Sequence, residues 1–477
     1  MMLIEVTLMK GEITNLFSEC LDYKGGVRCM SEKLRQAVGE SAFVEGEAAI
    51  ARLSKDYYWY SPVLEQELAG KTADYVIVPE TEEELKQAVM AAVIEKIPVT
   101  VRGGGTGNYG QAVPMTGGLV VDVSKLTEIL EIGDGFVRVQ AGARLREIEK
   151  AIHETDQELT IYPSTFVKAT VGGFVSGGSG GIGSVTWGNL WDGNIISAKM
   201  ITMENELREL TVSGPELEPY IHSYGTTGIM TEVTIPIKPK SRWVQQIYAF
   251  DNLTDALDFS RTVSEQGKWK KRLVSVMEAP ISAFFKPLKK QIGAADQALV
   301  LIEIDESNQE RLEEEAVAYR GAAIYTVSAD QYRKGIGISD FTWNHTTLWA
   351  LKSDKTWTYL QNFFSIDDLH HQVRQIKDRY GDDVLLHFEW LRDKGRLVPA
   401  ALPLVKFTSK EQLYDVIRFF NEIGASTNDP HTYLLGAGGW DMQMEAIAQK
   451  KKENDPFGLL NQEKIPDAAS IRGTTNV

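Results

Sequence analysis

Apolar and polar positions along the first half of this chain predict short strands, two helices and two glycine-rich segments. Runs rich in β-branched residues predict strands at 75–79, 99–102, 118–123 and 136–140. Apolar residues at helical spacing predict helices at 82–95 and 145–153. The strand at 99–102 runs into glycines, and a segment dense in Gly and Ser covers 170–188.

The pattern changes after a proline-rich stretch at 235–240, which predicts a turn and a domain boundary. Helices are expected at 308–319, 367–380 and 410–423. Strands are expected at 272–278, 298–304, 356–363, 384–390, 398–407 and 432–435. This alternation predicts an α+β fold in which a mostly antiparallel sheet is covered by helices on one face.

Composition narrows the classes of partner. The chain has 477 residues, enough for two or three domains, and its formal charge of −16 disfavours non-specific binding to nucleic acid or anionic membranes. An anionic substrate would need a local basic clamp. Cys20 and Cys29 lack the spacing of a zinc or thiol-redox site, and the N-terminus lacks the pattern of a signal peptide. No apolar run reaches membrane-spanning length, so we expect a cytoplasmic protein.

The first glycine-rich loop covers residues 102–110, and Gly105 to Gly110 matches the pattern G-x-G-x-x-G. A Rossmann unit needs a helix after the last glycine. Only residues 111–117, with Pro114 among them, precede the next strand, which leaves no room for that helix. The loop can still form a cradle of backbone N–H groups for a pyrophosphate, because glycine has no Cβ to block the approach.

The second glycine-rich segment, 170–183, offers a similar backbone surface along a flat, extended ligand. Either loop alone could be an ordinary glycine-rich turn. Two of them in one domain favour a large cofactor.

The glycine-rich segments also carry a family resemblance. Together with Pro79 and the stretches 117–122, 139–142, 163–164 and 225–229, they resemble the FAD-binding domain of the vanillyl-alcohol oxidase/p-cresol methylhydroxylase (PCMH) superfamily. The tail at 455–461 is similar to the ending of the glycolate oxidase/D-lactate dehydrogenase-like branch, which returns to the FAD domain. The resemblance implies a two-subdomain PCMH-type FAD-binding domain and an antiparallel-sheet cap that supplies the substrate side.

We therefore expect an N-terminal helical extension at 1–60, the FAD-binding domain at 61–240, the cap at 241–440 and a returning C-terminal segment at 441–477. Relatives with covalent flavin carry a histidine where this chain has Thr106, or a cysteine in the second segment, which has none here. These two linkages are thus excluded, whereas a linkage to a histidine of the cap, as in some relatives, stays open. We predict non-covalent FAD. The residues that the resemblance assigns to the cofactor are Arg102, Gly103, Gly104, Gly105, Thr106, Gly107, Asn108, Pro163, Ser164, Thr170, Gly172, Gly173, Ser176, Gly177, Gly180, Gly181, Ile182, Gly183, Gly228, Ile229 and Asn461.

The cap departs from the hydroxy-acid dehydrogenases of this superfamily. Their paired-histidine metal motif and the glutamate–histidine motif after it are absent. The corresponding stretch, residues 424–433, contains neither. Adjacent His370 and His371 would point about 100° apart on a helix, so we do not expect them to share a metal ion. We therefore predict no metal site.

Candidate catalytic residues lie in three segments of the cap. On the strand at 384–391, His387 and Glu389 share one face, and that face points either to the flavin or to solvent at a sheet edge. A carboxylate beside a histidine can orient it and raise its basicity. If residues 341–352 are helical, His345, Trp349 and Lys352 share a face and could offer base, platform and cation, unless they are aromatic packing under the cap.

The third segment is 429–433, a turn that enters the predicted strand and could project His431 and Tyr433 into a cleft or could be a simple turn. Arg392 could clamp a carboxylate, although an arginine beside Asp393 is more often a surface ion pair.

The sequence thus predicts an FAD-dependent oxidoreductase that oxidises a hydroxyl-bearing small molecule, with a 2-hydroxy acid as first choice. The alternatives are a sugar, alditol or aryl alcohol oxidase, an NADPH-dependent reductase and a non-catalytic flavin-binding protein. The electron acceptor, whether oxygen, a quinone or a carrier protein, stays open, and the chain could form a homodimer.

Overall fold

Two sheets build the half of the molecule that contains both glycine-rich loops. The computed structural model describes residues 34–293, 295–439 and 443–466. A parallel sheet has the order β1 (Tyr75–Ile77), β3 (Leu119–Asp122), β2 (Val99–Arg102). The second sheet has the order β4 (Ile129–Ile132), β5 (Phe136–Gln140), β9 (Ile229–Pro239), β7 (Ser197–Ile201), β8 (Glu209–Ser213), with β6 (Gln157–Leu159) also paired to β9.

Helices pack against these sheets through apolar faces. In α5 (Glu82–Glu95), Leu85 and Val89 are fully buried against the parallel sheet, and the Thr81 hydroxyl accepts the Glu84 N–H at the N-cap. The other helices of this half are α3 (Glu47–Leu53), α4 (Pro62–Glu67), α6 (Leu145–Ile152), α7 (Val171–Gly177) and α8 (Ser184–Trp187). Predicted elements at 75–79, 82–95, 99–102, 118–123, 136–140 and 145–153 are confirmed to within two residues.

An eight-stranded antiparallel sheet forms the cap. The chain crosses it in the order β13 (Ala322–Val327), β10 (Trp243–Phe250), β12 (Ala298–Asp305), β11 (Lys271–Met277), β17 (His387–Asp393), β18 (Arg396–Ala401), β15 (Asn362–Phe363), β20 (Ser426–Thr427). Beside it lies a small sheet of β14 (Trp357–Tyr359), β19 (Leu404–Lys406) and β16 (Val384–Leu385).

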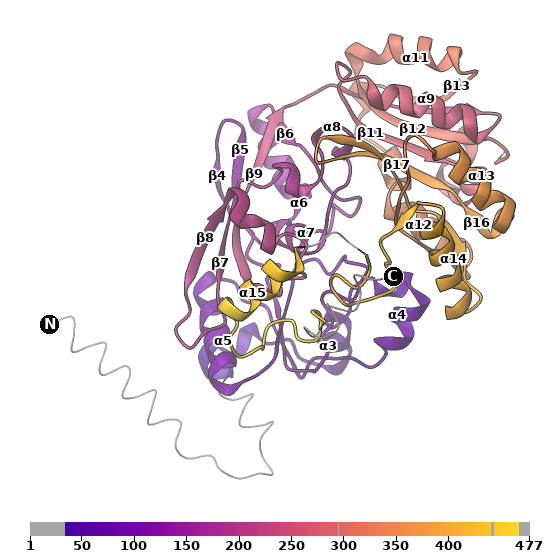
Figure 1. The fold of residues 1–477 in the computed structure, drawn as a ribbon. Coiled ribbons are helices and arrows are strands. Elements are labelled where there is room, and N and C mark those ends of the chain that lie inside the picture. The colour runs from indigo at the N-terminus through magenta and orange to yellow at the C-terminus, as the bar shows by residue number, and fades with distance from the viewer. Residues whose placement is uncertain (1–33, 294, 440–442, 467–477) are drawn as a thin grey trace, which may run out of the picture.

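The two faces of the cap sheet have different partners. Phe388 and Trp390 pack under α9 (Leu253–Glu265), α11 (Gln309–Ala318), α13 (Leu369–Tyr380) and α14 (Lys410–Glu422). Leu273, Met277 and other residues of the opposite face share a core with the FAD-side sheet. Figure 1 shows these helices on the outer side of the cap. The predicted α+β fold, with an antiparallel cap sheet covered by helices on one face, is confirmed.

Several predicted elements need correction. The stretch 235–240 is no turn, because β9 runs through Pro236 and reaches Pro239. The predicted strands at 356–363, 384–390 and 398–407 each split between the large and the small sheet. The predicted strand at 432–435 is absent, and that stretch is irregular. Strand β10 was missed because Gln245 and Gln246 interrupt its apolar pattern, although both side chains are buried and hydrogen-bonded.

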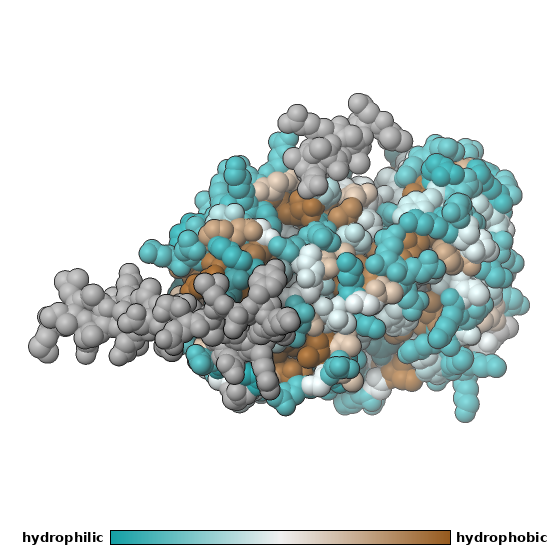
Figure 2. Space-filling view, turned by 90° about the horizontal axis from the view of Figure 1, so that it is seen from below, coloured by the Kyte–Doolittle hydropathy of each residue, from teal (hydrophilic) through white to brown (hydrophobic). Residues whose placement is uncertain are grey.

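The C-terminal segment lies against the first half of the chain. Helix α15 (Met444–Asn454) precedes a parallel bridge between Leu460 and Val99, the first residue of β2. The Asn461 N–H donates to the Val99 carbonyl at 2.7 Å. Figure 2 shows that hydrophilic residues cover most of one face of the molecule, with apolar patches between them.

Candidate cofactor and substrate site

A large cleft lies between the two glycine-rich segments and the cap. Its empty volume is about 1630 Å³, open solvent at its mouth included. Its walls include residues 101–109, 111–112, 163–165, 169–170, 172–174, 176–180, 224–225, 228–230, 343–344, 361–363 and 400–402. Ligand sites concentrate at such domain boundaries. The cleft thus extends along both glycine-rich segments and borders both halves of the molecule.

Glycines in the first loop are required by close contacts. A Cβ on Gly104 would lie 2.2 Å from the Lys168 carbonyl oxygen, and one on Gly105, whose φ is +60°, would lie 2.0 Å from Arg102 Nη2. Arg102 Nη1 donates to the Leu53 and Lys55 carbonyls at 2.5 and 2.9 Å, and its Nε lies 3.4 Å from Asp122. Arg102 thus ties the loop to residues 53–55 and to Asp122. No helix follows Gly110 before β3, as predicted.

The second segment begins as a helix, which the sequence did not predict. In α7 the Thr170 hydroxyl accepts the Gly173 N–H at 3.2 Å, and one side of the helix lines the cleft. Gln111 joins the two segments, because its Nε2 donates to the Gly177 carbonyl at 2.7 Å. The two loops therefore form one continuous wall.

Most residues assigned to the cofactor line this cleft. Those that do are Arg102, Gly103, Gly104, Gly105, Thr106, Gly107, Asn108, Pro163, Ser164, Thr170, Gly172, Gly173, Ser176, Gly177, Gly180, Gly228 and Ile229.

Four assigned residues lie behind the wall instead. Gly181 and Gly183 let the chain approach the 160–163 backbone, since a Cβ on either would lie within about 2.1 Å of a carbonyl oxygen there, and Ile182 forms a bridge with Tyr162. Asn461 accepts the Val101 N–H at 3.1 Å and donates to the Tyr224 carbonyl. These four contacts shape the cleft from outside it.

The His387–Glu389 pair is buried but does not line the cleft. His387 Nε2 lies 2.8 Å from Glu389 Oε1, and both side chains are at most 1 % exposed. The alternative of a solvated strand edge is therefore wrong, because β17 lies inside the sheet between β11 and β18.

The remaining cap candidates also lie outside the cleft wall. His345 lies on α12 (Asn344–Ser353), and Lys352 contacts the Trp349 ring on the same helix, as the predicted spacing requires. Burial and the nearby Lys352 charge lower the pKa of His345 to about 4. Arg392 donates to the Gly395 carbonyl at the end of its hairpin.

His431 and Tyr433 hold neighbouring segments together. His431 Nδ1 lies 2.7 Å from Ser61 Oγ, and Nε2 lies 2.8 Å from the Tyr359 carbonyl oxygen. Because a carbonyl only accepts, Nε2 carries the proton and Nδ1 accepts from Ser61. Tyr433 packs beside Leu68 and under the Lys464 ammonium group. Both predicted residues thus have structural contacts.

Several residues that line the cleft were not predicted from the sequence. Those on the cap side include Trp343, Asn344, Gln361, Asn362 and Asn428, and those on the FAD side include Asp56, Tyr109, His222 and Tyr224. Asn and Gln carry no strong sequence signal for a site. Chain topology alone brings β15 and the start of α12 to the same cleft.

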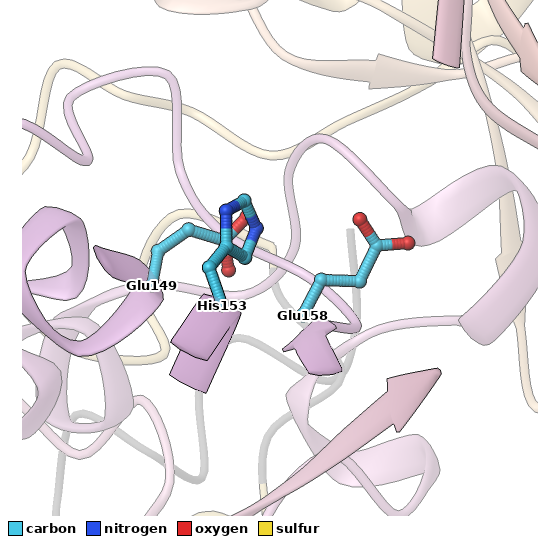
Figure 3. Close-up of side chains that lie close together, drawn as sticks. All are labelled: Glu149, His153 and Glu158. Carbon is cyan, nitrogen blue, oxygen red and sulfur yellow. The ribbon is translucent and has the colours of Figure 1, made fainter. Parts of the chain in front are cut away.

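One cluster has the composition of a metal site. Ligand atoms of Glu149, His153 and Glu158 lie within 4.8 Å of one another (Figure 3). Arg333 lies 2.9 Å from Glu149, and Arg272 lies 3.6 Å from Glu158. Two guanidinium groups already supply the positive charge that a metal ion would bring, so we interpret the cluster as part of a buried ion network.

The comparisons with known proteins agree with the geometry. Residues 73–211 match a family model described as FAD binding domain. An uncharacterized FAD-linked oxidoreductase from Mycobacterium tuberculosis is 29 % identical over 44 % of this chain and 46 % of its own length. A D-lactate dehydrogenase from Archaeoglobus fulgidus is 30 % identical over 38 % and 43 %. The chain thus spans about half the length of these curated relatives.

Longer matches exist at lower identity. Glycolate oxidase subunit GlcD from Bacillus subtilis is 24 % identical over 82 % of this chain and 88 % of that protein. A solved alkyldihydroxyacetonephosphate synthase superposes with a TM-score of 0.72 at 15 % identity, covering 92 % of this chain and 85 % of its own, which supports the fold alone. Within the described ranges, every helix is too short or too polar to cross a bilayer.

Proposed function

Because residues 73–211 match a family model described as FAD binding domain, we propose that the protein is an FAD-dependent oxidoreductase that oxidises a hydroxyl-bearing small molecule. One observation carries the proposal: the two glycine-rich segments and a polar part of the cap line the same cleft. A cofactor on the glycine wall and a substrate under the cap would therefore be neighbours.

The glycine wall fits FAD. A Cβ at Gly103, Gly104 or Gly172 would lie 2.0–2.7 Å from atoms of neighbouring protein segments, so these segments need glycine to pack this closely. Glycine N–H groups along such a wall can bind a pyrophosphate. Residues 103–108 and 172–177 would hold the pyrophosphate, and Gly228 with Ile229 would line other parts of the cofactor. When bound, FAD supplies the hydride acceptor. We propose that it is held without a covalent bond, as Thr106 implies.

The proton of the substrate hydroxyl needs an acceptor in the cleft. Burial lowers the pKa of His222 to about 4, so its ring is neutral at pH 7. Its Nδ1 lies 2.8 Å from the Gly178 carbonyl oxygen and must carry the proton, which leaves Nε2 as the basic nitrogen. We propose His222 as the first base to test, ahead of His387, His345 and His431, because it lines the cleft.

Two substrate classes have support, 2-hydroxy acids and uncharged sugars or alditols. The names of relatives, D-lactate dehydrogenase and glycolate oxidase subunit, support a 2-hydroxy acid. The polar amides on the cap wall favour an uncharged sugar or alditol. The electron acceptor, a homodimer and a cytoplasmic location stay proposals from the sequence.

Steady-state turnover with an artificial electron-accepting dye tests the proposal. Each of the 2-hydroxy acids, alditols and aryl alcohols is offered to the FAD-loaded protein, and NADPH consumption is followed in parallel. Dye reduction by a hydroxyl compound, lost in His222→Gln, is expected. NADPH consumption without any hydroxyl substrate would favour the reductase alternative, and an inactive protein that holds FAD would favour the non-catalytic one.

A further inference from the structure

The corner between Trp343 and Asn344 has an unusual backbone. Trp343 has φ +53° and ψ −141°, a conformation that bulky L-residues rarely adopt. Its N–H donates to Glu389 Oε1 at 2.7 Å, and both Trp343 and Asn344 line the cleft. Strained backbone of this kind persists only where its surroundings enforce it, and it concentrates at functional sites.

The surroundings that enforce it are three buried side chains of the cap sheet. The Ser275 hydroxyl donates to Glu389 Oε1 at 2.8 Å, and His387 Nε2 contacts the same oxygen at 2.8 Å. Ser275 lies on β11, opposite Glu389 on β17. The Glu389 carboxylate is thus fixed by its own sheet and in turn fixes the start of α12. It also places negative charge at the positive end of that helix.

Three polar atoms of residues that line the cleft have no hydrogen-bond partner among the described residues. They are Trp343 Nε1, Asn344 Oδ1 and Asn362 Oδ1, all buried atoms of side chains that line the cleft. Asn362 is 2 % exposed, and its Nδ2 donates to Thr427 Oγ1 at 2.7 Å and to the Ala425 carbonyl at 3.4 Å. Those contacts fix the amide orientation, so Oδ1 is the atom left to bind a ligand.

These atoms select for hydroxyl groups. Two of them accept hydrogen bonds, and a carboxylate, which also only accepts, cannot satisfy them. A hydroxyl group donates and accepts, so it can serve the amide oxygens and the indole N–H alike. Among the described lining residues, Arg102 is the one with a permanent positive charge, and it already contacts Asp122 and two carbonyls.

We infer that the substrate of the proposed oxidation is an uncharged polyol, bound under the cap by Trp343, Asn344 and Asn362, and that Ser275, His387 and Glu389 are positioning residues for this corner. The inference rests on the proposed function and narrows its substrate. It also gives the His387–Glu389 pair a role other than that of the general base.

Matched substrates test the charge preference. The FAD-loaded protein is offered glycerol against D-glycerate and D-sorbitol against D-gluconate, and anaerobic flavin reduction is measured. The polyols should give second-order rate constants of flavin reduction at least about tenfold above those of the acids. Faster reduction by the acids would overturn the inference and leave the proposed oxidation intact, whereas no reduction by any hydroxyl compound would defeat the proposed function itself.

Substitutions at Asn344, Asn362 and Glu389 test whether these residues bind or position the substrate. Turnover is measured with a polyol that reduces the flavin. Asn362→Leu and Asn344→Ala should each raise KM by about tenfold, the typical effect of one lost hydrogen bond, with the Kd for FAD unchanged. Glu389→Ala should raise KM similarly, and Glu389→Gln, which keeps an oxygen for the Trp343 N–H, should restore most of it. The matched control Glu306→Ala removes an exposed carboxylate that pairs with Arg242, and it should change nothing.

The readouts separate this role from others. A weaker Kd for FAD in Asn344→Ala or Asn362→Leu would mean that the amides serve the cofactor, and a fall in kcat at constant KM in Glu389→Ala would mean a catalytic base. Either result overturns the inference. If Glu389→Ala does not fold, Glu389→Gln and the two asparagine variants decide the question.

Discussion

Gly104 shows at the scale of one residue why the cofactor loop is made of glycine. A Cβ at this position would lie 2.2 Å from the Lys168 carbonyl oxygen, so the first loop and the segment before α7 could not keep their present distance. The clash would be between the new Cβ and a backbone oxygen, so no change of side-chain rotamer could relieve it.

We therefore predict that Gly104→Ala weakens FAD binding by about tenfold or more, equivalent to ~1.4 kcal/mol. Gly267→Ala is the matched control, because a Cβ there meets nothing within 4 Å. Titration of the apoprotein with FAD, followed by flavin fluorescence, measures both. Equal affinity in the two variants would show that FAD does not lie on this wall.

His345 predicts part of the pH dependence of stability. Its pKa is lowered from 6.5 to about 4 in the folded protein, chiefly by burial. Below pH 6.5 the unfolded chain therefore binds a proton that the folded chain does not, and stability falls by about 1.4 kcal/mol per pH unit down to about pH 4.

His345→Phe should remove that slope from the free energy of unfolding. Urea titration between pH 4.5 and 6.5 measures it, because this range lies between the folded pKa of about 4 and the ordinary pKa of 6.5. His371→Phe, at an exposed position of α13, should keep the wild-type dependence. A variant slope equal to the wild-type slope would contradict the assigned burial effect.

Residue orientation within an element could be predicted, whereas depth could not. Period-two alternation correctly separated Phe388 and Trp390 from His387 and Glu389. What covers the second pair is the start of α12, and its contact with Glu389 depends on the left-handed backbone of Trp343. No local sequence pattern encodes such a contact.

At the scale of elements, Ser61 links helix α4 to the loop that carries His431. Its hydroxyl accepts the Leu64 N–H at 3.1 Å as the N-cap of α4 and donates to His431 Nδ1 at 2.7 Å. One small side chain thus satisfies two segments that lie far apart in sequence.

We predict that Ser61→Ala lowers the free energy of unfolding by about 2–4 kcal/mol, the sum of a lost cap and a buried nitrogen left without a partner. Ser409→Ala removes the cap of α14 and an exposed contact with Glu411, and it should cost about 1 kcal/mol. Calorimetric unfolding compares the two variants. Similar costs would mean that the His431 contact contributes nothing.

Elements were predicted well where local pattern decides them. The exclusion of a Rossmann helix after Gly110 rested on the few residues before β3, and it holds. The split of 384–390 into β16 and β17 could not be foreseen, because it depends on the Glu278 carboxylate that accepts the Leu386 N–H. Glu278 is remote in sequence, so the break is tertiary.

On the scale of the whole molecule, the cap and the FAD-side half form one body around the cleft. They share a hydrophobic core and a buried ion network in which Arg272 faces Glu158 and Arg333 faces Glu149. Sequence indicated both halves, but it could not pair these charges across the boundary. The cleft inherits its shape from that fixed arrangement.

The proposed function requires that a hydroxyl compound under the cap reduces FAD on the glycine wall. Visible absorbance of the bound flavin tests it most directly, recorded without oxygen while polyols, 2-hydroxy acids, aryl alcohols or NADPH are added. We expect bleaching by hydroxyl compounds, fastest with polyols. Bleaching by NADPH alone, or by none of them, would contradict the proposed function.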